Sequence, residues 1–380
     1  MTQSIRARAT AACAALLAFT AALLTAAALA APAGAAVPSD FWGAVPQNPL
    51  SAGQLERLKR GGVDSLRIIV DWTSMQKSPR SEIEWSSVDS QVEAFAKAHI
   101  EVLPFLYGAP RWAVPVGTVP GGGAKAPTHL PVRGRAASGW AAFARQAVER
   151  YGPRGTFWGE HPEIPRDPIR TWQIWNEPNF KYFVTRPNPG EYGRLVKISA
   201  HAIHAAEPRA TVLLGGLFAR PGEAGRYHPP RAYTAVEFLE LMFKRSPGVG
   251  ASFDGVALHP YTTSYTTLPG EIEEVRSLLR RRGAGNKGLW LTELGWSAES
   301  PSHGDAFAKG VRGQATQLTG AFRLLRNNAA RWRLRQVFWF SVDDLPNACN
   351  FCGGSGLFRN GFRPRPAWRD YVRFAGGRAS

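Results

Sequence analysis

Long apolar runs are scarce in this chain of 380 residues, and the only one lies at its beginning. Arg6 and Arg8 precede an Ala/Leu-rich run at residues 11–30, and small residues at 33–36 offer a cleavage site. This order is typical of a secretory signal peptide, so we expect residues 1–36 to be removed and the protein to be secreted. A membrane anchor is the alternative. No later segment has the roughly 18 apolar residues that spanning needs, so we expect no membrane span in the mature chain.

Cysteine is almost absent, with three residues in the whole chain, one of them in the leader. The mature chain keeps only Cys349 and Cys352, in the stretch NACNFCGGSGLF. In a cytosolic protein such a pair would suggest redox work or half of a zinc site. In an exported chain without other cysteines we predict a structural disulfide between them.

Metal and phosphate sites also lack their usual signals. No carboxylate clusters with His or Cys at metal-ligand spacing, so we predict neither a catalytic metal nor another cofactor. The glycines at 121–123 lie in a Pro-rich loop and do not open a helix, which is the wrong context for phosphate binding.

Acidic residues are few, 29 against 46 basic ones, which gives a net charge of +17. Of the basic residues 37 are Arg, and they are scattered along the chain. A nucleic-acid-binding protein more often concentrates its positive charge on one face, so we expect no nucleic-acid partner. A compositional bias toward Arg is one explanation, and attraction to an anionic cell envelope is another. We expect a monomer.

The pattern that fills the mature chain is strand, loop and helix, repeated eight times. The predicted strands lie at residues 41–45, 65–72, 101–108, 169–175, 210–218, 253–261, 288–296 and 334–344. Most of them are nearly continuous apolar runs, as in a parallel sheet that is covered on both faces. We therefore predict an α/β fold, a single-domain (β/α)8 TIM barrel over residues 37–380, with a doubly wound sheet as the alternative.

Two glutamates end predicted strands. Glu177 follows the fourth strand in TWQIWNEPNF, and Glu293 lies in the seventh, in LWLTELGW. Pro178 cannot donate to a sheet ladder, so the fourth strand must end beside Glu177. In a barrel the carboxyl ends of the strands carry the chemistry, which makes both residues candidates for it.

The conjunction of WNEP in strand four, Thr-Glu in strand seven and Arg67 in strand two resembles clan A of the glycoside hydrolases. These are retaining (β/α)8 enzymes, and the pattern is nearest to families 39 and 5. The resemblance extends over nearly all of the mature chain. It implies a hydrolase that cleaves O-glycosidic bonds of an oligo- or polysaccharide through a covalent glycosyl-enzyme intermediate.

The same resemblance implies separate roles for the two carboxylates. Glu177 matches the general acid/base, and Glu293 matches the nucleophile. The apolar Trp175 and an anionic Glu293 nearby would both raise the pKa of Glu177, as a proton donor requires.

Arg67 lies inside the apolar run SLRIIVDW, where a buried cation needs a partner. A guanidinium that reaches Glu293 would satisfy both groups and hold the carboxylate charged. The alternative partner is Asp71, four residues further on the same strand face.

The resemblance also implies a set of substrate contacts. Asn176 matches the residue that binds the sugar's 2-hydroxyl, although strict strand alternation would point it away from Glu177 unless the strand bends. His259 and Tyr261 match residues that contact the sugar or the nucleophile, and Trp339 matches an aromatic floor for the sugar ring, with core packing as its alternative. Further candidates for subsite walls, or else for caps on the barrel, are Tyr107, Trp112, Phe180, Tyr182 and Trp296.

Two rivals share this residue set. A carbohydrate-binding pseudoenzyme would need no clamp on a nucleophile, and a transglycosylase differs only in its acceptor.

The long Gly/Pro-rich loop at residues 108–134 is expected to form one wall of the substrate cleft.

Overall fold

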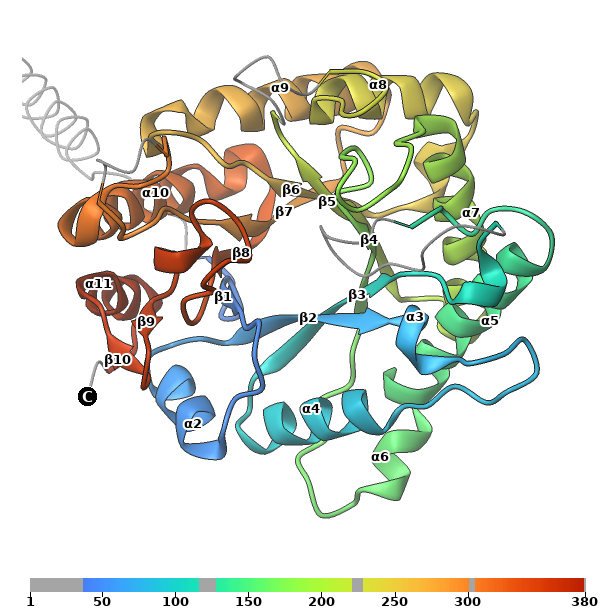
Figure 1. The fold of residues 1–380 in the computed structure, drawn as a ribbon, viewed down its shortest axis with the longest axis horizontal. Coiled ribbons are helices and arrows are strands. Elements are labelled where there is room, and N and C mark those ends of the chain that lie inside the picture. The colour runs from blue at the N-terminus through green and yellow to red at the C-terminus, as the bar shows by residue number, and fades with distance from the viewer. Residues whose placement is uncertain (1–36, 116–127, 221–227, 301–304, 379–380) are drawn as a thin grey trace, which may run out of the picture. The chain divides into compact units, whose positions relative to one another are not determined.

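The computed structural model describes residues 37–115, 128–220, 228–300 and 305–378, which form one barrel unit (Figure 1). All eight barrel strands are parallel, and they follow one another around the ring in chain order. Their bounds are β1 (Trp42–Val45), β2 (Ser65–Asp71), β3 (Glu101–Tyr107), β4 (Thr171–Asn176), β5 (Thr211–Phe218), β6 (Gly255–His259), β7 (Gly288–Leu294) and β8 (Leu334–Phe340).

The ring closes because β1 pairs with both β2 and β8. The predicted (β/α)8 barrel is therefore confirmed, and the doubly wound alternative, which would leave two edge strands, is wrong.

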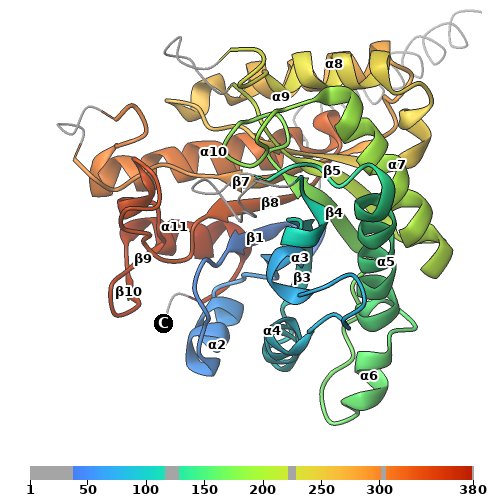
Figure 2. The ribbon, with the colours of Figure 1, turned by 45° about the vertical axis from the view of Figure 1, so that its right-hand side comes forward.

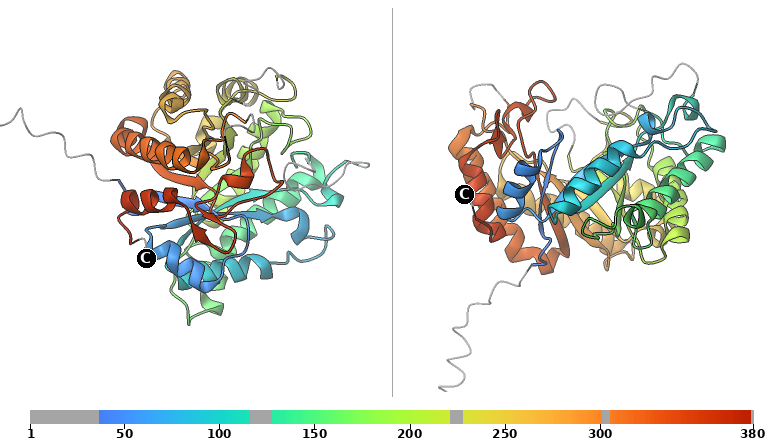
Figure 3. Two further views of the ribbon diagram at one scale, coloured as in Figure 1. Left: turned by 60° about the vertical axis from the view of Figure 1, so that its left-hand side comes forward. Right: turned by 90° about the horizontal axis from the view of Figure 1, so that it is seen from below.

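Helices surround the barrel on its outside (Figure 1). Each strand is followed by one long helix, and two short helices, α3 and α6, are added. Neighbouring helices pack against each other, as α5 and α7 do in Figure 2 and α10 and α11 do in Figure 3. The helices are α2 (Ala52–Arg60), α3 (Trp72–Met75), α4 (Ser86–Lys97), α5 (Gly134–Tyr151), α6 (Thr156–Glu160), α7 (Pro189–Ala206), α8 (Ala235–Arg245), α9 (Leu268–Arg281), α10 (Gly310–Trp332) and α11 (Pro366–Ala375).

Local sequence explains where several helices begin. Ser51 and Gln54 form a capping box at α2, and Thr234 and Glu237 form another at α8. These reciprocal bonds satisfy amide groups that the first turn leaves without partners. Among the described helices, none is long and apolar enough to cross a bilayer.

The inside of the barrel is a packed apolar core. It includes Val45, Leu103, Leu213, Ala257, Trp290 and Phe338, one or two side chains from most strands. Because side chains alternate along a strand, Phe338 and Phe340 point inward and Trp339 points outward, toward Phe322 of α10. The polar site described below lies in the same interior.

Two sequence predictions fall on residues outside the described ranges. The leader, residues 1–36, is one. The central part of the long third loop, residues 116–127, is the other; beyond it Thr128 bridges to Val184 in the loop after β4. The cleavage near residues 33–36 and the cleft wall remain predictions.

Gly216 of β5 couples the fold to the site. Its carbonyl accepts a hydrogen bond of 3.1 Å from the amide of Glu177, and a Cβ at this position would collide with the ring of His259. The barrel therefore requires a glycine here so that the His259 ring can lie against β5.

We expect Gly216→Ala to lower the free energy of unfolding by about 1–3 kcal/mol, because overpacking a core forces side chains off their positions. Urea unfolding measures this. Gly270→Ala in α9 is the control, since a Cβ there meets nothing within 4 Å; it should stabilise by up to about 1 kcal/mol through helix propensity. Equal stability of the two variants would contradict this account of Gly216.

Candidate active site

The two strand-end glutamates meet at the carboxyl end of the barrel. Glu177 follows β4, Glu293 lies near the end of β7, and ligand oxygens of the two carboxylates lie within 4.8 Å of each other. Both residues are almost fully buried, 6% and 8% exposed. Two carboxyl groups this close and this dry cannot both ionise without large cost, so one of them is expected to hold a proton.

The end of β4 bends so that consecutive side chains reach the site. Trp175 has φ 74° and Glu177 has φ 40°, both in the left-handed region that non-glycine residues rarely adopt. This twist breaks the alternation that would have sent Asn176 and Glu177 to opposite faces. On β7 Thr292 shares the inward face of Trp290, and a register irregularity between Leu291 and Leu294 lets the next residue, Glu293, reach the interior as well.

Arg67 of β2 is the centre of the hydrogen-bond network. It is 1% exposed and donates from Nη1 to Glu293 Oε1 (2.7 Å), from Nη2 to Asn176 Oδ1 (2.6 Å) and from Nε to Gln173 Oε1 (3.1 Å). The predicted Arg67–Glu293 pair is present. The alternative with Asp71 is wrong, because the Asp71 carboxylate instead accepts the amide of Thr73 at the start of α3.

Glu293 is held at both oxygens. Arg67 binds Oε1, and the hydroxyl of Tyr261 donates to Oε2 at 2.7 Å. Burial raises the pKa of Glu293, while the charge of Arg67 and the two hydrogen bonds oppose that shift. The clamp fixes the direction of the carboxylate and favours its ionised form.

Glu177 has a different environment. Burial, and then the nearby Glu293, raise its pKa well above the usual range, and the charge of Arg67 opposes this only from a distance. Since Arg67 bonds directly to Glu293, the shared proton is expected on Glu177.

His259 of β6 bonds to Glu177 and to Thr292, the residue before Glu293 on β7. Its Nδ1 shares a hydrogen bond of 2.8 Å with Glu177 Oε1, and its Nε2 shares one of 3.0 Å with the hydroxyl of Thr292. The ring is fully buried, and burial followed by the charge of Arg67 lowers the pKa of His259 well below its usual value. A neutral imidazole here orients Glu177 without adding a positive charge.

Asn176 contributes an oriented amide. Its Oδ1 accepts from Arg67, so its nitrogen is the atom that can donate to a ligand. Arg67, Asn176, Glu177, His259, Tyr261 and Glu293 thus form one contiguous site, as the sequence predicted.

Three aromatic residues do not line this site. Trp339 is fully buried on the outer face of β8 and donates to the carbonyl of Ser355, and Trp296 is fully buried and donates to the carbonyl of Thr262. Tyr107 is 1% exposed and packs on Trp175. The expected sugar contacts of Trp339, Trp296 and Tyr107 are therefore corrected to packing roles. Of the other proposed walls, Trp112 packs on Trp72, Phe180 is buried, and Tyr182 stays half-exposed beside it.

The aromatic side chains that pack around Tyr261 at the site were not predicted from the sequence. Phe340, on the inward register of β8, lies 6.2 Å from the ring of Tyr261. Around Tyr261 there are also Phe218, Phe307 and Phe351, with ring centroids at 5.7, 6.2 and 5.2 Å. In the structure Phe338 faces the core, so alternation places Trp339 outside and Phe340 inside, but the sequence alone does not show this parity. Loop residues such as Phe351 follow no such alternation.

The donor set also bears on metal binding. Among the residues that the structure describes, Glu177, His259 and Glu293 form the one group close enough to share an ion. The guanidinium of Arg67 already occupies Glu293, and a second cation beside it would be repelled. The absence of a catalytic metal remains a prediction.

The predicted disulfide is present: Cys349 and Cys352 are bonded in the loop after β8.

Removal of Arg67 tests the clamp through stability. We expect Arg67→Ala to cost about 3–5 kcal/mol in the free energy of unfolding at pH 7, because it leaves Glu293 buried without its counter-charge. Arg282→Ala, which breaks an exposed pair with Glu240, should cost less than about 1 kcal/mol. Similar losses in the two variants, measured by guanidinium unfolding, would be evidence against a buried clamp.

Comparisons with known proteins find a relative by sequence and similar structures by fold. No family profile matches the chain. A β-xylosidase from Geobacillus stearothermophilus is 26% identical over 255 residues, 61% of this chain and 44% of that enzyme, so the chain spans less than half of its length.

Solved structures show the same fold. A family 39 glycoside hydrolase from Bacteroides cellulosilyticus superposes with a TM-score of 0.63 at 19% identity, covering 89% of this chain and 64% of that one. A family 5 (subfamily 18) enzyme from Bifidobacterium longum subsp. infantis gives 0.58 at 14% identity, over 88% and 78%. The predicted resemblance to clan A glycoside hydrolases, near family 39, is confirmed.

Proposed function

We propose that this protein is a retaining glycoside hydrolase that cleaves O-glycosidic bonds by double displacement. The observation that carries the proposal is the pair Glu177 and Glu293, whose oxygens lie within 4.8 Å of each other in two contrasting environments. Retaining enzymes place their carboxyl groups about 5–5.5 Å apart, whereas inverting enzymes need roughly 6.5–9.5 Å to admit a water molecule. One oxygen of each carboxylate thus lies within 4.8 Å of an oxygen of the other, which is nearer to the retaining spacing than to the inverting one and supports a retaining mechanism.

In the first step Glu293 attacks the anomeric carbon while Glu177 gives its proton to the leaving oxygen. The bond from Glu293 to the sugar forms as the bond to the leaving group breaks, and Glu177 is left ionised. Arg67 and Tyr261 keep the attacking carboxylate aimed, and the amide nitrogen of Asn176 is available to the 2-hydroxyl.

In the second step Glu177 acts as a base. It takes a proton from water, which attacks the same carbon and releases Glu293, so two inversions give net retention. The neutral His259, bonded to Glu177, holds this carboxyl in place in both protonation states.

The β-xylosidase relative makes an aryl β-xyloside the first substrate to test. A pseudoenzyme would release no product, and a transglycosylase would transfer the glycosyl group to another sugar instead of to water. The intact clamp on Glu293 favours an enzyme over a pseudoenzyme, and a product chromatogram separates all three.

We infer that the protein acts outside the cell. The leader composition and the Cys349–Cys352 disulfide both support export, since disulfides persist in oxidising compartments. The excess of basic residues would then favour association with an anionic envelope. Monomeric state remains a prediction.

The two glutamates should respond differently to replacement. Glu293→Ala removes the nucleophile and should abolish turnover on every substrate. Glu177→Ala should still react with an aryl glycoside that has an acidic phenol, and then stall for lack of a base. Azide should rescue Glu177→Ala with a β-glycosyl azide product, and should give the α-anomer with Glu293→Ala. Identical behaviour of the two variants would overturn the assignment.

Dependence on pH offers a second test. With a poor leaving group, kcat/KM should fall as pH rises through the raised pKa of Glu177, because only the protonated form donates, and fall again at low pH as Glu293 is protonated. Glu177→Gln should lose the alkaline limb and about 10²–10⁴-fold in rate. An alkaline limb that persists in Glu177→Gln would assign the proton donor elsewhere.

A further inference from the structure

Tyr261 must keep its ring in place if its hydroxyl is to hold Glu293. The hydroxyl donates to Glu293 Oε2 at 2.7 Å, and a small rotation of the ring would lengthen this bond. Since Tyr261 follows β6 and lies outside the strand ladder, its orientation depends on the side chains packed around it. Of the phenylalanine rings around it, Phe351 is the nearest, at 5.2 Å.

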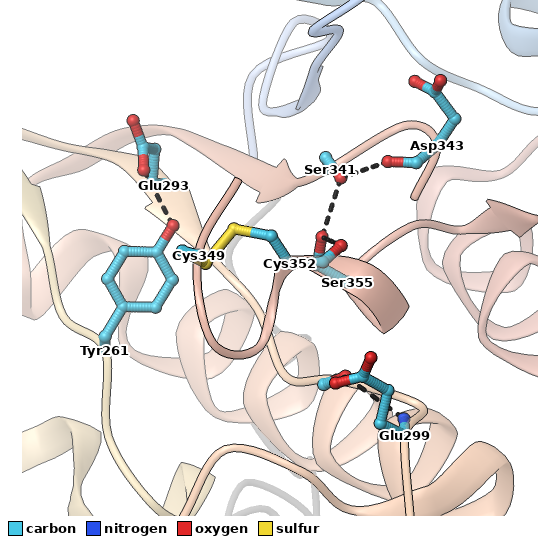
Figure 4. Close-up of a disulfide and its surroundings, with 9 residues drawn as sticks. Tyr261, Glu293, Glu299, Ser341, Asp343, Cys349, Cys352 and Ser355 are labelled. Carbon is cyan, nitrogen blue, oxygen red and sulfur yellow. Dashed lines mark hydrogen bonds between the residues drawn. A yellow bond between two sulfur atoms is a disulfide. The ribbon is translucent and has the colours of Figure 1, made fainter. Parts of the chain in front are cut away.

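Phe351 lies inside the small ring that the disulfide closes. The bond joins Cys349 to Cys352, and between them lie only Asn350 and Phe351. Cys352 itself belongs to the same buried cluster as Tyr261 and Phe340. Figure 4 shows the bridge beside Tyr261, together with the hydrogen bond from Tyr261 to Glu293.

The two sides of this loop are anchored unequally. After Cys352 the chain is fixed: the side chain of Gln314 donates to the carbonyls of Gly354 and Ser355, and Ser355 bonds to Ser341. Before Cys349, residues 346–348 are exposed. Phe351 precedes Cys352 directly, and its carbonyl accepts a hydrogen bond from the amide of Gly354, so its C-terminal side is fixed. The disulfide and the hydrogen bond from the Cys352 amide to the Cys349 carbonyl close a four-residue ring that also restricts its N-terminal side.

We propose that Phe351 is a positioning residue, held by the Cys349–Cys352 disulfide, that orients Tyr261 toward the nucleophile Glu293. The inference rests on the proposed function of the site. Phe307 lies 5.1 Å from Phe351, and the ring centroids of Phe307 and Phe351 lie 6.2 and 5.2 Å from that of Tyr261. Reduction of the disulfide leaves the four-residue ring closed by hydrogen bonds alone, which loosens Phe351 and weakens the clamp.

A double-mutant cycle with an aryl β-xyloside tests this coupling. Phe351→Ala should lower kcat about 5-fold, an effect of the size expected for one aromatic contact. In a Tyr261→Phe background, which lacks the hydroxyl, Phe351→Ala should change kcat less than about 2-fold. Phe351→Trp should recover most of the activity. Phe362→Ala, which removes a half-buried ring that stacks on Phe358 away from the site, should leave kcat unchanged.

The role of the disulfide has its own comparison. Cys349→Ser/Cys352→Ser should lose kcat in the same direction as Phe351→Ala, and a reducing agent should lower the wild-type rate but not the rate of this variant. Equal effects of Phe351→Ala with and without the Tyr261 hydroxyl would overturn the proposal. So would full activity of both Phe351→Ala and the double serine variant.

A failure of the proposed function would be distinguishable. If the wild type turns over no glycoside of a broad panel, the function is wrong, and the contact is then tested by melting temperature. Phe351→Ala should lower Tm in the wild type and clearly less in Tyr261→Ala; equal shifts in Tm would refute the contact itself.

Discussion

The buried positive charge of Arg67 determines how the polar side chains inside this barrel are arranged. Arg67 is 1% exposed in the middle of an apolar strand, where an unpaired guanidinium would be very costly. Its donors are therefore matched by acceptors from three side chains, Gln173, Asn176 and Glu293, on two other strands. The same bonds that make the arginine tolerable also fix the carboxylate that is proposed to attack the sugar, so stability and reactivity depend on one interaction.

The different environments of the Glu177 and Glu293 carboxyl groups follow from the bonds that Arg67 makes. Glu293 receives the arginine and the phenol of Tyr261, while Glu177 receives only a neutral imidazole and a dry environment. Burial acts on both groups, but a direct counter-ion acts on one. The two carboxyl groups thus have different environments although their oxygens lie within 4.8 Å of each other, as the proposed proton donor and nucleophile require. The left-handed backbone at Trp175 and Glu177 is the local strain that permits this arrangement.

Much of this was predictable from the sequence. Eight apolar strands in alternation with helices predict the barrel. Pro178 predicts where β4 ends, and Arg67 in an apolar strand predicts a buried acidic partner. Trp339 was misplaced because three consecutive aromatic residues, 338–340, show no alternation of polar and apolar side chains that would indicate which parity faces inward. The ring of Phe351 escaped notice because its position depends on a loop and a disulfide, whose conformation no periodicity encodes. Thr292 was not predicted because the sequence of β7 does not show which parity faces inward; in the structure Thr292 shares the inward face of Trp290 and bonds to His259.

The central claim is that Glu293 forms a covalent bond to the sugar. A 2-deoxy-2-fluoro β-xyloside with an acidic leaving group slows breakdown of such an intermediate, so the protein should accumulate it. Mass spectrometry of the intact protein should show one added fluoroxylosyl group, and peptide mapping should locate it on Glu293. An adduct on Glu177, or turnover of the unfluorinated xyloside with inverted configuration at the anomeric carbon, would contradict the account.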